Sequence, residues 1–373
     1  MSYVLFFFWL LGFVFLWKIP GLKRTENSHP YDAHLSIIVP ARNEEKNLAR
    51  LLKSLDQQVH RPDEVIVVDD HSEDGTAAVG ERYGCKVIRS KEIPQGWIGK
   101  PWACWQGAHA AVNDILLFLD ADTCLEPDGL SKLLSSFLEN EGLLTVQPYH
   151  AMIKNYERLS AIFNIIVLAG INAFTPLRSK VKPAGAFGPC MMCRKDHYFE
   201  VGGHEIAKND ILESISLGKA FINAGQNVHC YGGKGTIFFR MYPAGLRSLV
   251  EGFSKGFGIG ANAISLTVLM MIVCWVFGGV SLTRHLIQSI IAGDLSGVIT
   301  WMTLDILYAA QIHWMLVRIG NFGIRTAILF QIPLLFFVLV FALSILKTFI
   351  MKQTRWKGRI VNTKGAEKKS SCD

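Results

Sequence analysis

Two apolar segments of this chain end in paired acidic residues, and this pattern restricts the fold more than any other feature. Val67-Val68 leads into Asp69-Asp70, and the run 116–119 leads into Asp120-Ala121-Asp122. Open α/β sheets bind ligands at the carboxyl ends of their strands, and alternate residues of a strand share a face. Asp120 and Asp122 can therefore reach one ligand. Two carboxylates with open positions beside them suit Mg²⁺ or Mn²⁺ bound to a diphosphate, as in a nucleotide sugar.

The surrounding pattern is typical of an α/β fold. Buried strands are expected at 35–39, 65–68, 86–88 and 115–119, and helices between them at 48–55, 76–83 and 102–111. Strands that alternate with helices predict a parallel, doubly wound sheet. The acidic pairs then lie at one edge of that sheet.

Both ends of the chain are too apolar for an ordinary soluble enzyme. Half of the 373 residues are apolar, and the mean hydropathy is +0.27. Residues 3–17 carry no charge and are followed by Lys18. A cleaved signal peptide has its basic residues before the apolar run, so residues 1–22 are expected to remain as an N-terminal membrane anchor.

The C-terminal third contains three further apolar runs, at 263–282, 298–317 and 326–346. Basic residues at 23–24 and eight Lys or Arg between 347 and 369 place the catalytic region and the tail on the cytoplasmic side. That orientation requires an even number of crossings after the catalytic region. Because 298–317 contains Asp305, we expect that run not to be a full span.

The resulting organisation is a multi-pass cell-membrane protein in four parts. They are an anchor at 1–22, a catalytic domain at 30–260, a transmembrane region at 261–350 and a basic cytoplasmic tail at 351–373. The apolar run 160–175 is expected to be a core or membrane-surface helix, because a span there would separate Asp122 from Glu213. No nucleic-acid partner is expected, since no binding module accompanies the basic tail.

The eight cysteines show no framework spacing. Cys190-Met191-Met192-Cys193 is a single C-x-x-C pair, whereas a zinc site would need a second pair. In a cytosolic domain we expect these two thiols to be reduced and packed.

The segments 37–45, 67–76 and 119–122 occur in an order and spacing that resembles the family 2 inverting glycosyltransferases. The resemblance implies a nucleotide-sugar-binding domain in which Pro40 and Glu44 border the base. It also implies that Asp70 binds uracil and that Asp122 holds the metal, with Asp120 nearby. Lys100, between Gly99 and Pro101, is a phosphate-binding candidate, and a solvated surface lysine is the alternative.

Further segments, at 142–150, 186–189, 239–242 and 251–255, look like those of the bacterial family 2 enzymes that glycosylate the C30 carotenoid acid 4,4'-diaponeurosporenoate. This resemblance implies transfer of glucose from UDP-glucose to a carotenoid carboxylate, with the acceptor delivered from the bilayer. Other carotenoid-pathway enzymes are then possible partners. Alternatives are another lipid acceptor, such as a hopanoid, diacylglycerol or polyprenyl phosphate, and a non-enzymatic membrane protein that keeps the fold.

The residues near 214 depart from the family pattern. Many family 2 enzymes have an aspartate general base where this chain has Ser214, and Glu213 and Asp210 are the nearby substitutes. A hydroxyl acceptor needs a base, but a carboxylic acid with a pKa of about 4 is already ionised. We therefore hypothesise that Ser214 is tolerated because the acceptor is a carboxylate.

Three other side chains have open roles. Arg240 either pairs with an acceptor carboxylate or forms a salt bridge, and Lys255 faces either diphosphate or lipid headgroups. His204, in an expected loop, is interpreted as structural.

Overall fold

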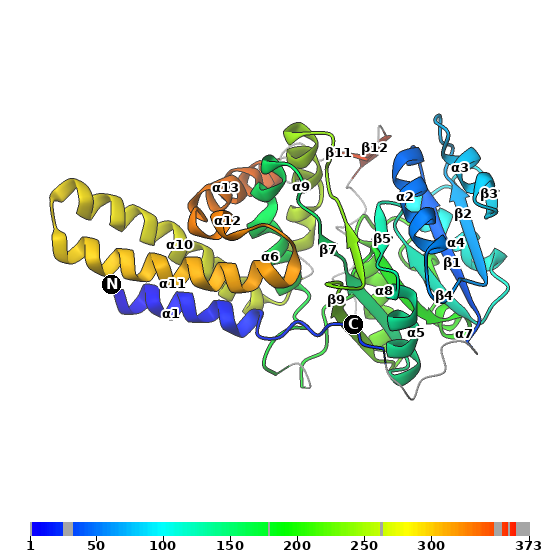
Figure 1. Ribbon diagram of the computed structural model, residues 1–373, viewed down its shortest axis with the longest axis horizontal. Coiled ribbons are helices and arrows are strands. Elements are labelled where there is room, and N and C mark those ends of the chain that lie inside the picture. The colour runs from blue at the N-terminus through cyan, green and yellow to red at the C-terminus, as the bar shows by residue number, and fades with distance from the viewer. Residues whose placement is uncertain are drawn as a thin grey trace, which may run out of the picture.

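The computed structural model describes residues 2–24, 33–177, 180–261, 264–346, 353–356 and 359–362. It consists of an α/β body and an elongated group of helices that projects from one side of it (Figure 1). The body contains every candidate site residue whose side chain is described.

The central sheet has seven strands in the order β3-β2-β1-β4-β8-β6-β9. Their bounds are β1 Leu35–Ala41, β2 Glu64–Asp69, β3 Lys86–Arg89, β4 Ile115–Leu119, β6 Leu143–Gln147, β8 Cys190–Arg194 and β9 Val228–Gly232. The four strands expected from the sequence are all present and mutually parallel, with Pro40 opposite Val68 and Ile38 opposite Phe118.

The expectation of a wholly parallel sheet is wrong at β8. This strand runs antiparallel to both β4 and β6, so the sheet is mixed. Residues 190–193 are buried on both faces, and an apolar run of this kind carries no signal for strand direction. The direction is set by the long connection between β6 and β8.

Two apolar cores lie on opposite faces of the sheet, because side chains alternate along each strand. Ile38 belongs to one core together with α4 (Gly99–Ala110), whereas Ile37 and Val39 belong to the other together with α2 (Glu45–Asp56) and α5 (Gly129–Glu139). The helix predicted at 48–55 is confirmed, since its four leucines are all buried. The helices α3 (Thr76–Arg82), α7 (Lys195–Glu200) and α8 (Glu213–Asn223) and the short η3 (Gly203–Glu205) complete the body.

A second, three-stranded sheet supports the loop that follows β4. It comprises β5 (Thr123–Leu125), β10 (Ile237–Phe239) and β7 (Tyr149–His150), in that order. β5 begins directly after Asp122 and pairs with β10, which fixes the acidic loop at one end. These strands are short, and no strand was expected there from the sequence. A two-stranded hairpin, β11 (Gln353–Trp356) and β12 (Arg359–Asn362), follows the last helices.

The projecting group contains α1 (Ser2–Phe15), α10 (Leu266–Ala292) and α11 (Leu295–Ile319), which pack side by side (Figure 1). Among the described residues, α10 and α11 are the two helices long and apolar enough to cross a membrane, by length and composition alone. The run 298–317, expected not to span, is part of an unbroken 25-residue helix. The run 326–346 is instead divided into α12 (Ile324–Ile328) and α13 (Gln331–Ile345).

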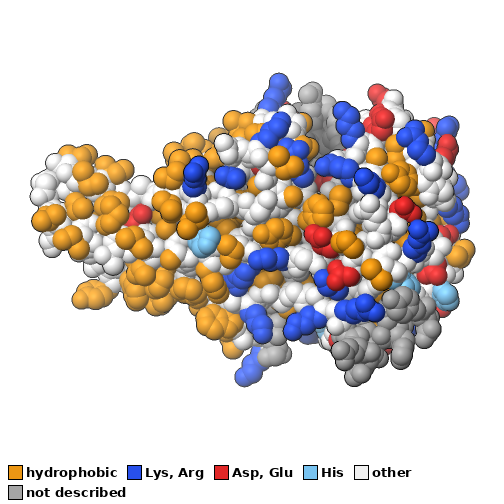
Figure 2. Space-filling model, viewed as in Figure 1, with side chains coloured by type: hydrophobic (Ala, Val, Ile, Leu, Met, Phe, Trp, Pro, Cys, Tyr) orange, Lys and Arg blue, Asp and Glu red, His pale blue; other side chains and the backbone are white. Residues whose placement is uncertain are grey.

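Two polar side chains of α11, Asp305 and Gln311, are hydrogen-bonded inside the helix group and do not break the helix. The carboxylate of Asp305 accepts a hydrogen bond from Gln331 at 2.7 Å, and Gln311 bonds Trp275 and the backbone of Trp9. Polar side chains in such helices face other helices and pair there. The hydrophobic side chains are displayed outward over much of this projection, whereas Lys, Arg, Asp and Glu gather mainly on the body (Figure 2).

Between the body and the projection lie η2 (Asn155–Ser160), α6 (Ala161–Gly170) and α9 (Leu246–Ala261). All but one of the α6 residues are buried, and the helix packs against α10, α11 and α13. The expectation of a core helix at 160–175 is therefore confirmed for its first two-thirds, and the helix ends at Gly170.

The C-x-x-C pair lies on β8 with Cys190 in one core and Cys193 in the other. Both thiols are free and buried, and burial raises the pKa of each. Because they face opposite sides of the sheet, they cannot bind one metal ion together, and the packed-thiol interpretation is confirmed.

Candidate active site

A cavity of about 170 Å³ lies at the carboxyl ends of β1, β2 and β4. The sheet order reverses at β1, and ligands of open α/β sheets bind at such switch points. The cavity is lined by Pro40, Ala41, Arg42, Glu44, Asp70, Lys100, Ala103, Asp120, Ala121 and Asp122. The structure thus brings together all the residues predicted to bind the nucleotide or the metal.

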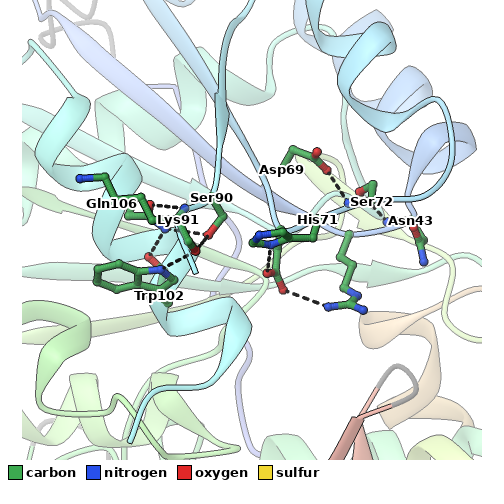
Figure 3. A network of polar contacts seen from close by, with 10 residues as sticks. Asn43, Asp69, His71, Ser72, Ser90, Lys91, Trp102 and Gln106 are labelled. Carbon is green, nitrogen blue, oxygen red and sulfur yellow. Dashed lines mark hydrogen bonds and ion pairs between the residues drawn. The ribbon is translucent and has the colours of Figure 1, made fainter. Parts of the chain in front are cut away.

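Two loops, after β1 and after β2, hold each other in place on one side of the cavity. Asn43 and His71 have φ values of 54° and 56°, in the left-handed region that Asn and His tolerate better than most residues. The backbone N–H of Asn43 donates to Ser72 Oγ at 2.9 Å, and Asn43 Oδ1 accepts from the backbone of Glu73 at 2.8 Å. Figure 3 shows Asn43, Ser72 and Asp69 meeting at this junction.

The two neighbouring aspartates after β2 have different surroundings. Asp69 Oδ1 accepts the backbone N–H of Ser72 at 3.2 Å, so it stabilises the loop (Figure 3). Asp70 lines the cavity, with Arg42 Nη1 3.7 Å from Oδ2 and His71 Nδ1 3.4 Å from Oδ1. Alternation along the strand allowed only one of the pair to face a ligand, and the structure shows that it is Asp70.

Arg42 is a cavity residue that the sequence analysis did not single out. It follows Ala41, the last residue of β1, and its side chain is 17% exposed. Its position in the sequence could have identified it, because residues directly after a strand of this sheet lie at the edge where ligands bind.

Lys100 lies in the first turn of α4, where Pro101 is tolerated because the first backbone N–H groups of a helix have no intrahelical partner. A polar network fixes this helix against β3: Gln106 donates to Ser90 Oγ at 2.8 Å, and Trp102 donates to the Lys91 carbonyl at 3.1 Å (Figure 3). The position of Lys100 therefore follows from the packing of α4.

The ammonium group of Lys100 lies between two carboxylates, 2.7 Å from Asp120 Oδ1 and 3.0 Å from Glu213 Oε1. Burial disfavours the charged lysine, but Asp120 and Glu213 outweigh burial and hold the pKa of Lys100 well above its usual range. The side chain is 20% exposed. Lys100 is therefore not a solvated surface lysine, and its binding of phosphate stays a prediction.

The two substitutes proposed for a general base lie in different environments. Glu213 is the first residue of α8, its side chain is 8% exposed, and it faces Lys100. Asp210 instead accepts a hydrogen bond from Ser216 Oγ at 2.6 Å, and neither carboxylate is part of the cavity lining itself. The structure therefore brings Glu213 to the site and leaves Asp210 beside it.

The surroundings of Asp120 and Asp122 suit a divalent cation. The Lys100 ammonium already rests on Asp120, so this end of the cavity is built to hold positive charge. The described residues contain no group of three or more His, Cys, Asp or Glu side chains able to hold a metal. Two carboxylates supplemented by substrate phosphates and water are the usual arrangement for Mg²⁺, and Mn²⁺ favours the same oxygen ligands.

A second cavity, of about 580 Å³, lies between the body and the projecting helices. Its walls are almost entirely apolar and come from α6, α9, α10, α13 and the segment before α8; they include Val167, Leu212, Ile215, Phe253, Val276 and Phe337. Tyr242 also lines it, and burial, with the Asp122 carboxylate adding to it, raises the pKa of Tyr242 to about 12.

The remaining candidates have structural partners. Arg240 forms two hydrogen bonds, at 2.9 and 2.7 Å, with Oε1 of the buried Glu157, so the salt bridge is confirmed, and the acceptor-binding role stays a prediction. His204 is fully buried and bonded to Tyr198, and burial lowers its pKa to about 3. The side chain of Lys255 lies outside the described part of the chain.

Comparison with known proteins gives three findings. A model of glycosyl transferase family 2 matches residues 36–202. The 4,4'-diaponeurosporenoate glycosyltransferase of Staphylococcus haemolyticus (strain JCSC1435) is 38% identical over 330 residues, covering 87% of this chain and 88% of that protein. The enzyme of the same name from Staphylococcus aureus (strain MRSA252) is 36% identical over 87% of both chains.

A solved structure with a similar fold is that of a mannosyltransferase from Pyrobaculum calidifontis in complex with GDP-Man and Mn²⁺. It covers 94% of this chain and 95% of its own, with a TM-score of 0.55 and 14% sequence identity, so the likeness is one of fold. With a family match over residues 36–202 and relatives of this identity over most of their length, the chain belongs to glycosyltransferase family 2.

Proposed function

We propose that this protein is a membrane-bound, inverting glycosyltransferase that moves glucose from UDP-glucose to the carboxylate of a C30 carotenoid acid. The observation that carries the proposal is the arrangement around the start of α8. Ser214, in the position of the usual base, follows Leu212 and precedes Ile215, which line the large apolar cavity, and its Oγ borders the same space at Gly188 as Lys100 of the acidic cavity. The names of the two Staphylococcus relatives support the acceptor.

The residues of the first cavity are suited to a uridine diphosphate. Asp70 offers a carboxylate acceptor to the imide N–H of uracil, and Pro40 and Glu44 border the base. Arg42 and Lys100 supply positive charge at the same cavity, where a diphosphate needs it. Uridine diphosphate as the nucleotide of the donor and glucose as its sugar are both proposed here.

Asp120 and Asp122 would hold the divalent cation, Mg²⁺ or Mn²⁺, and the cation would neutralise charge on the diphosphate. Lys100 contributes a further fixed positive charge beside Asp120. Both charges favour departure of the nucleoside diphosphate.

The proposed step is a single displacement. One carboxylate oxygen of the acceptor forms a bond to the anomeric carbon, the bond from that carbon to the diphosphate oxygen breaks, and its electron pair leaves with UDP. No proton is transferred at the nucleophile, because a carboxylic acid is ionised at neutral pH. Glu213 then acts as a partner for Lys100 rather than as a base.

Membrane attachment follows from the acceptor's chemistry. A C30 acid is confined to the bilayer, and α10 and α11 are long and apolar enough to enter it. The body, with its charged surface, would lie at the cytoplasmic face (Figure 2). Enzymes that make or consume the carotenoid acid are the partners this location favours.

The experiment is product analysis with the full-length protein purified in detergent. UDP-glucose, Mg²⁺ and a C30 carotenoid acid should give a product one hexose heavier, and mild alkali should release the acid from it, as it does from an ester. A product stable to alkali, or hexose transfer only to a different lipid, would contradict the proposal.

A further inference from the structure

The two cavities are joined by two chain segments that run side by side. One is 184–188, which leads to β8, and the other is 212–215, which begins α8. The backbone N–H of Ala186 donates to the Ser214 carbonyl at 3.3 Å, and a Cβ on Gly185 would lie 2.7 Å from Ile215 Cα. This close approach makes one wall, which lines the apolar cavity at one end and reaches Lys100 of the nucleotide cavity at the other.

The two ends of that wall differ in polarity. At one end, Ala184, Leu212 and Ile215 line the apolar cavity. At the other end, Gly188 and Ser214 lie beside Lys100, which lines the nucleotide cavity. A ligand that follows the wall therefore passes from apolar contacts to an ammonium group within a few residues.

Gly188 leaves a small space at the polar end. A Cβ built on Gly188 would lie 3.3 Å from Ser214 Oγ and 3.5 Å from Lys100 Nζ. A hydroxyl donor and an ammonium donor thus border the same space, and the absence of a side chain keeps it open. Two donors of this kind are suited to the two oxygens of a carboxylate.

The opposite end of the apolar cavity is open on α10, where its lining residues Val273, Phe277 and Val280 are half exposed. This helix is one of the two long apolar helices of the projection (Figure 1). A ligand held in the membrane can therefore enter from that side. The cavity volume of about 580 Å³ lies within the usual range for small-molecule sites, about 300–1,000 Å³.

We propose that the apolar cavity binds the hydrocarbon chain of a long-chain carboxylic acid and that Gly188, Ser214 and Lys100 form the cradle for its carboxylate. The inference rests on the proposed function, and it deepens it by assigning the acceptor site. Ser214 is in this account a positioning residue that selects an acid over an uncharged head group. The ammonium group of Lys100 contacts the acceptor carboxylate while it keeps its ion pairs with Asp120 and Glu213.

Direct binding tests the cradle without turnover. The probes are a C30 carotenoid acid and its methyl ester, followed by the polyene absorbance retained on the purified protein, with no donor added. Wild type should bind the acid at least about tenfold more tightly than the ester, the worth of one hydrogen bond to a charged group. Ser214→Ala should bring the two affinities together by weakening the acid alone, and Ser214→Thr should restore the difference.

A glycine pair tests the space itself. Gly188→Ala should weaken binding of the acid, because the new Cβ fills the cradle. It should also weaken binding of the ester, which Ser214→Ala leaves unchanged. Gly21→Ala is the matched control, since a Cβ there meets nothing within 4 Å. Binding of UDP should be unchanged in the control, which also reports correct folding.

A valine pair tests the apolar cavity. Val276→Trp fills it and should weaken binding of both the acid and the ester at least about tenfold, while a short-chain acid of ten carbons or fewer is little affected. Val317→Trp, on the exposed side of α11, should change neither.

The outcomes separate the two proposals. If wild type makes the carotenoid ester but Ser214→Ala keeps its preference for the acid and Val276→Trp binds normally, the acceptor site assigned here is wrong and the proposed function stands. If wild type binds neither the acid nor the ester and transfers sugar to another acceptor, the proposed function fails, and this inference fails with it.

Discussion

Asp69 and Asp70 are adjacent and equally buried, yet only one of them lines the nucleotide cavity. Asp69 stabilises the backbone of the following loop, whereas Asp70 faces the cavity with Arg42 and His71 beside it. A strand alternates its side chains between two faces, so neighbouring residues of one type acquire different roles. The pair therefore offers a controlled comparison.

We expect Asp70→Ala to weaken UDP binding about tenfold to a hundredfold, because one hydrogen bond involving a charged group is worth about 1.5–3 kcal/mol. Asp69→Ala should instead lower the free energy of unfolding by about 1 kcal/mol, the worth of an ordinary hydrogen bond, with little change in UDP affinity. Isothermal titration with UDP and Mg²⁺, together with denaturant unfolding, measures both. An equal loss of UDP affinity in the two variants would contradict this assignment.

His204 makes the free energy of unfolding depend on pH. Burial, followed by the nearby Lys100, lowers its pKa to about 3, so the folded protein keeps the ring neutral. The unfolded chain takes up a proton below about pH 6.5, and the folded state does not until about pH 3. Stability should therefore fall as the pH is lowered through this window, by about 1.4 kcal/mol per pH unit for each such histidine.

His204→Gln should remove one histidine's share of that dependence. We expect unfolding measured between pH 6.5 and 4.5 to show a shallower slope for the variant than for wild type, even if the variant is less stable at pH 7. His150, which is fully buried with its pKa lowered to about 3 by burial, retains its own contribution in both proteins. Parallel slopes would show that His204 is not held neutral.

At the scale of single residues, the sequence indicated correctly most of the side chains that meet at the first cavity, and their binding of a nucleotide and a metal stays a proposal. Strand ends were recognisable from apolar runs, and Pro40, Glu44, Asp70, Lys100, Asp120 and Asp122 meet there. The ion pair between Lys100 and Glu213 was not predictable, because it joins residues more than a hundred positions apart, one in α4 and the other at the start of α8. The sequence left the partner of Arg240 open for the same reason, since Glu157 lies in a different element.

At the scale of elements, Gln311 is the polar link of the projecting helices. Its side chain accepts from Trp275 Nε1 at 2.9 Å and donates to the Trp9 carbonyl at 2.8 Å, so one residue of α11 joins α10 and α1. Gly12 makes the approach possible, because a Cβ there would lie 2.4 Å from Gln311 Oε1. Hydrogen bonds between membrane helices are each worth about 0.6–2 kcal/mol.

Gln311→Leu should therefore lower the thermal midpoint of the detergent-purified protein while leaving UDP affinity unchanged, because the site lies in the body. Gln331→Leu, which removes a hydrogen bond to Asp305 instead, should have a smaller effect, since it breaks one contact rather than two. Thermal unfolding followed by Trp fluorescence measures both. A loss of UDP binding in Gln311→Leu would show that the helix group and the body are coupled.

Strand direction and helix breaks could not be predicted from hydrophobic periodicity alone. Strands and helices at 35–119 follow the expected alternation, but the direction of β8 depends on a connection with no local signal. The run 326–346 has high hydropathy throughout, yet a break between α12 and α13 shortens it, while the more polar 298–317 continues unbroken. Polar residues that find partners on neighbouring helices do not interrupt a helix, and a single sequence does not show those partners.

At the scale of the whole molecule, α10 and α11 form a hairpin whose tip, at Gly293 and Asp294, carries no basic residue. Lys18 and Arg318 lie at the opposite end, beside the body. If both helices cross the membrane, the chain returns to its starting side, as the even number of crossings inferred from the charge pattern requires. The hairpin orientation therefore predicts a body and a tip on opposite faces of the membrane.

Single cysteines test this orientation. Ser296→Cys, next to the tip, should react with a membrane-impermeant maleimide in intact cells, and Lys234→Cys, on the body, should react only in inverted vesicles. Wild type measures the background from the native thiols. Labelling of both positions from the same side would show that the hairpin does not cross.

The central claim is that an ionised acid is glycosylated without a general base, because Ser214 occupies the position of the base. The measurement that tests it most directly is the initial rate of UDP release from UDP-glucose and Mg²⁺, with a C30 carotenoid acid or the corresponding alcohol as acceptor, for wild type and Ser214→Asp. Wild type should turn over with the acid alone, and Ser214→Asp should show no increase in the initial rate with the acid. Comparable wild-type turnover of the alcohol, or a large gain on the acid in the variant, would contradict it.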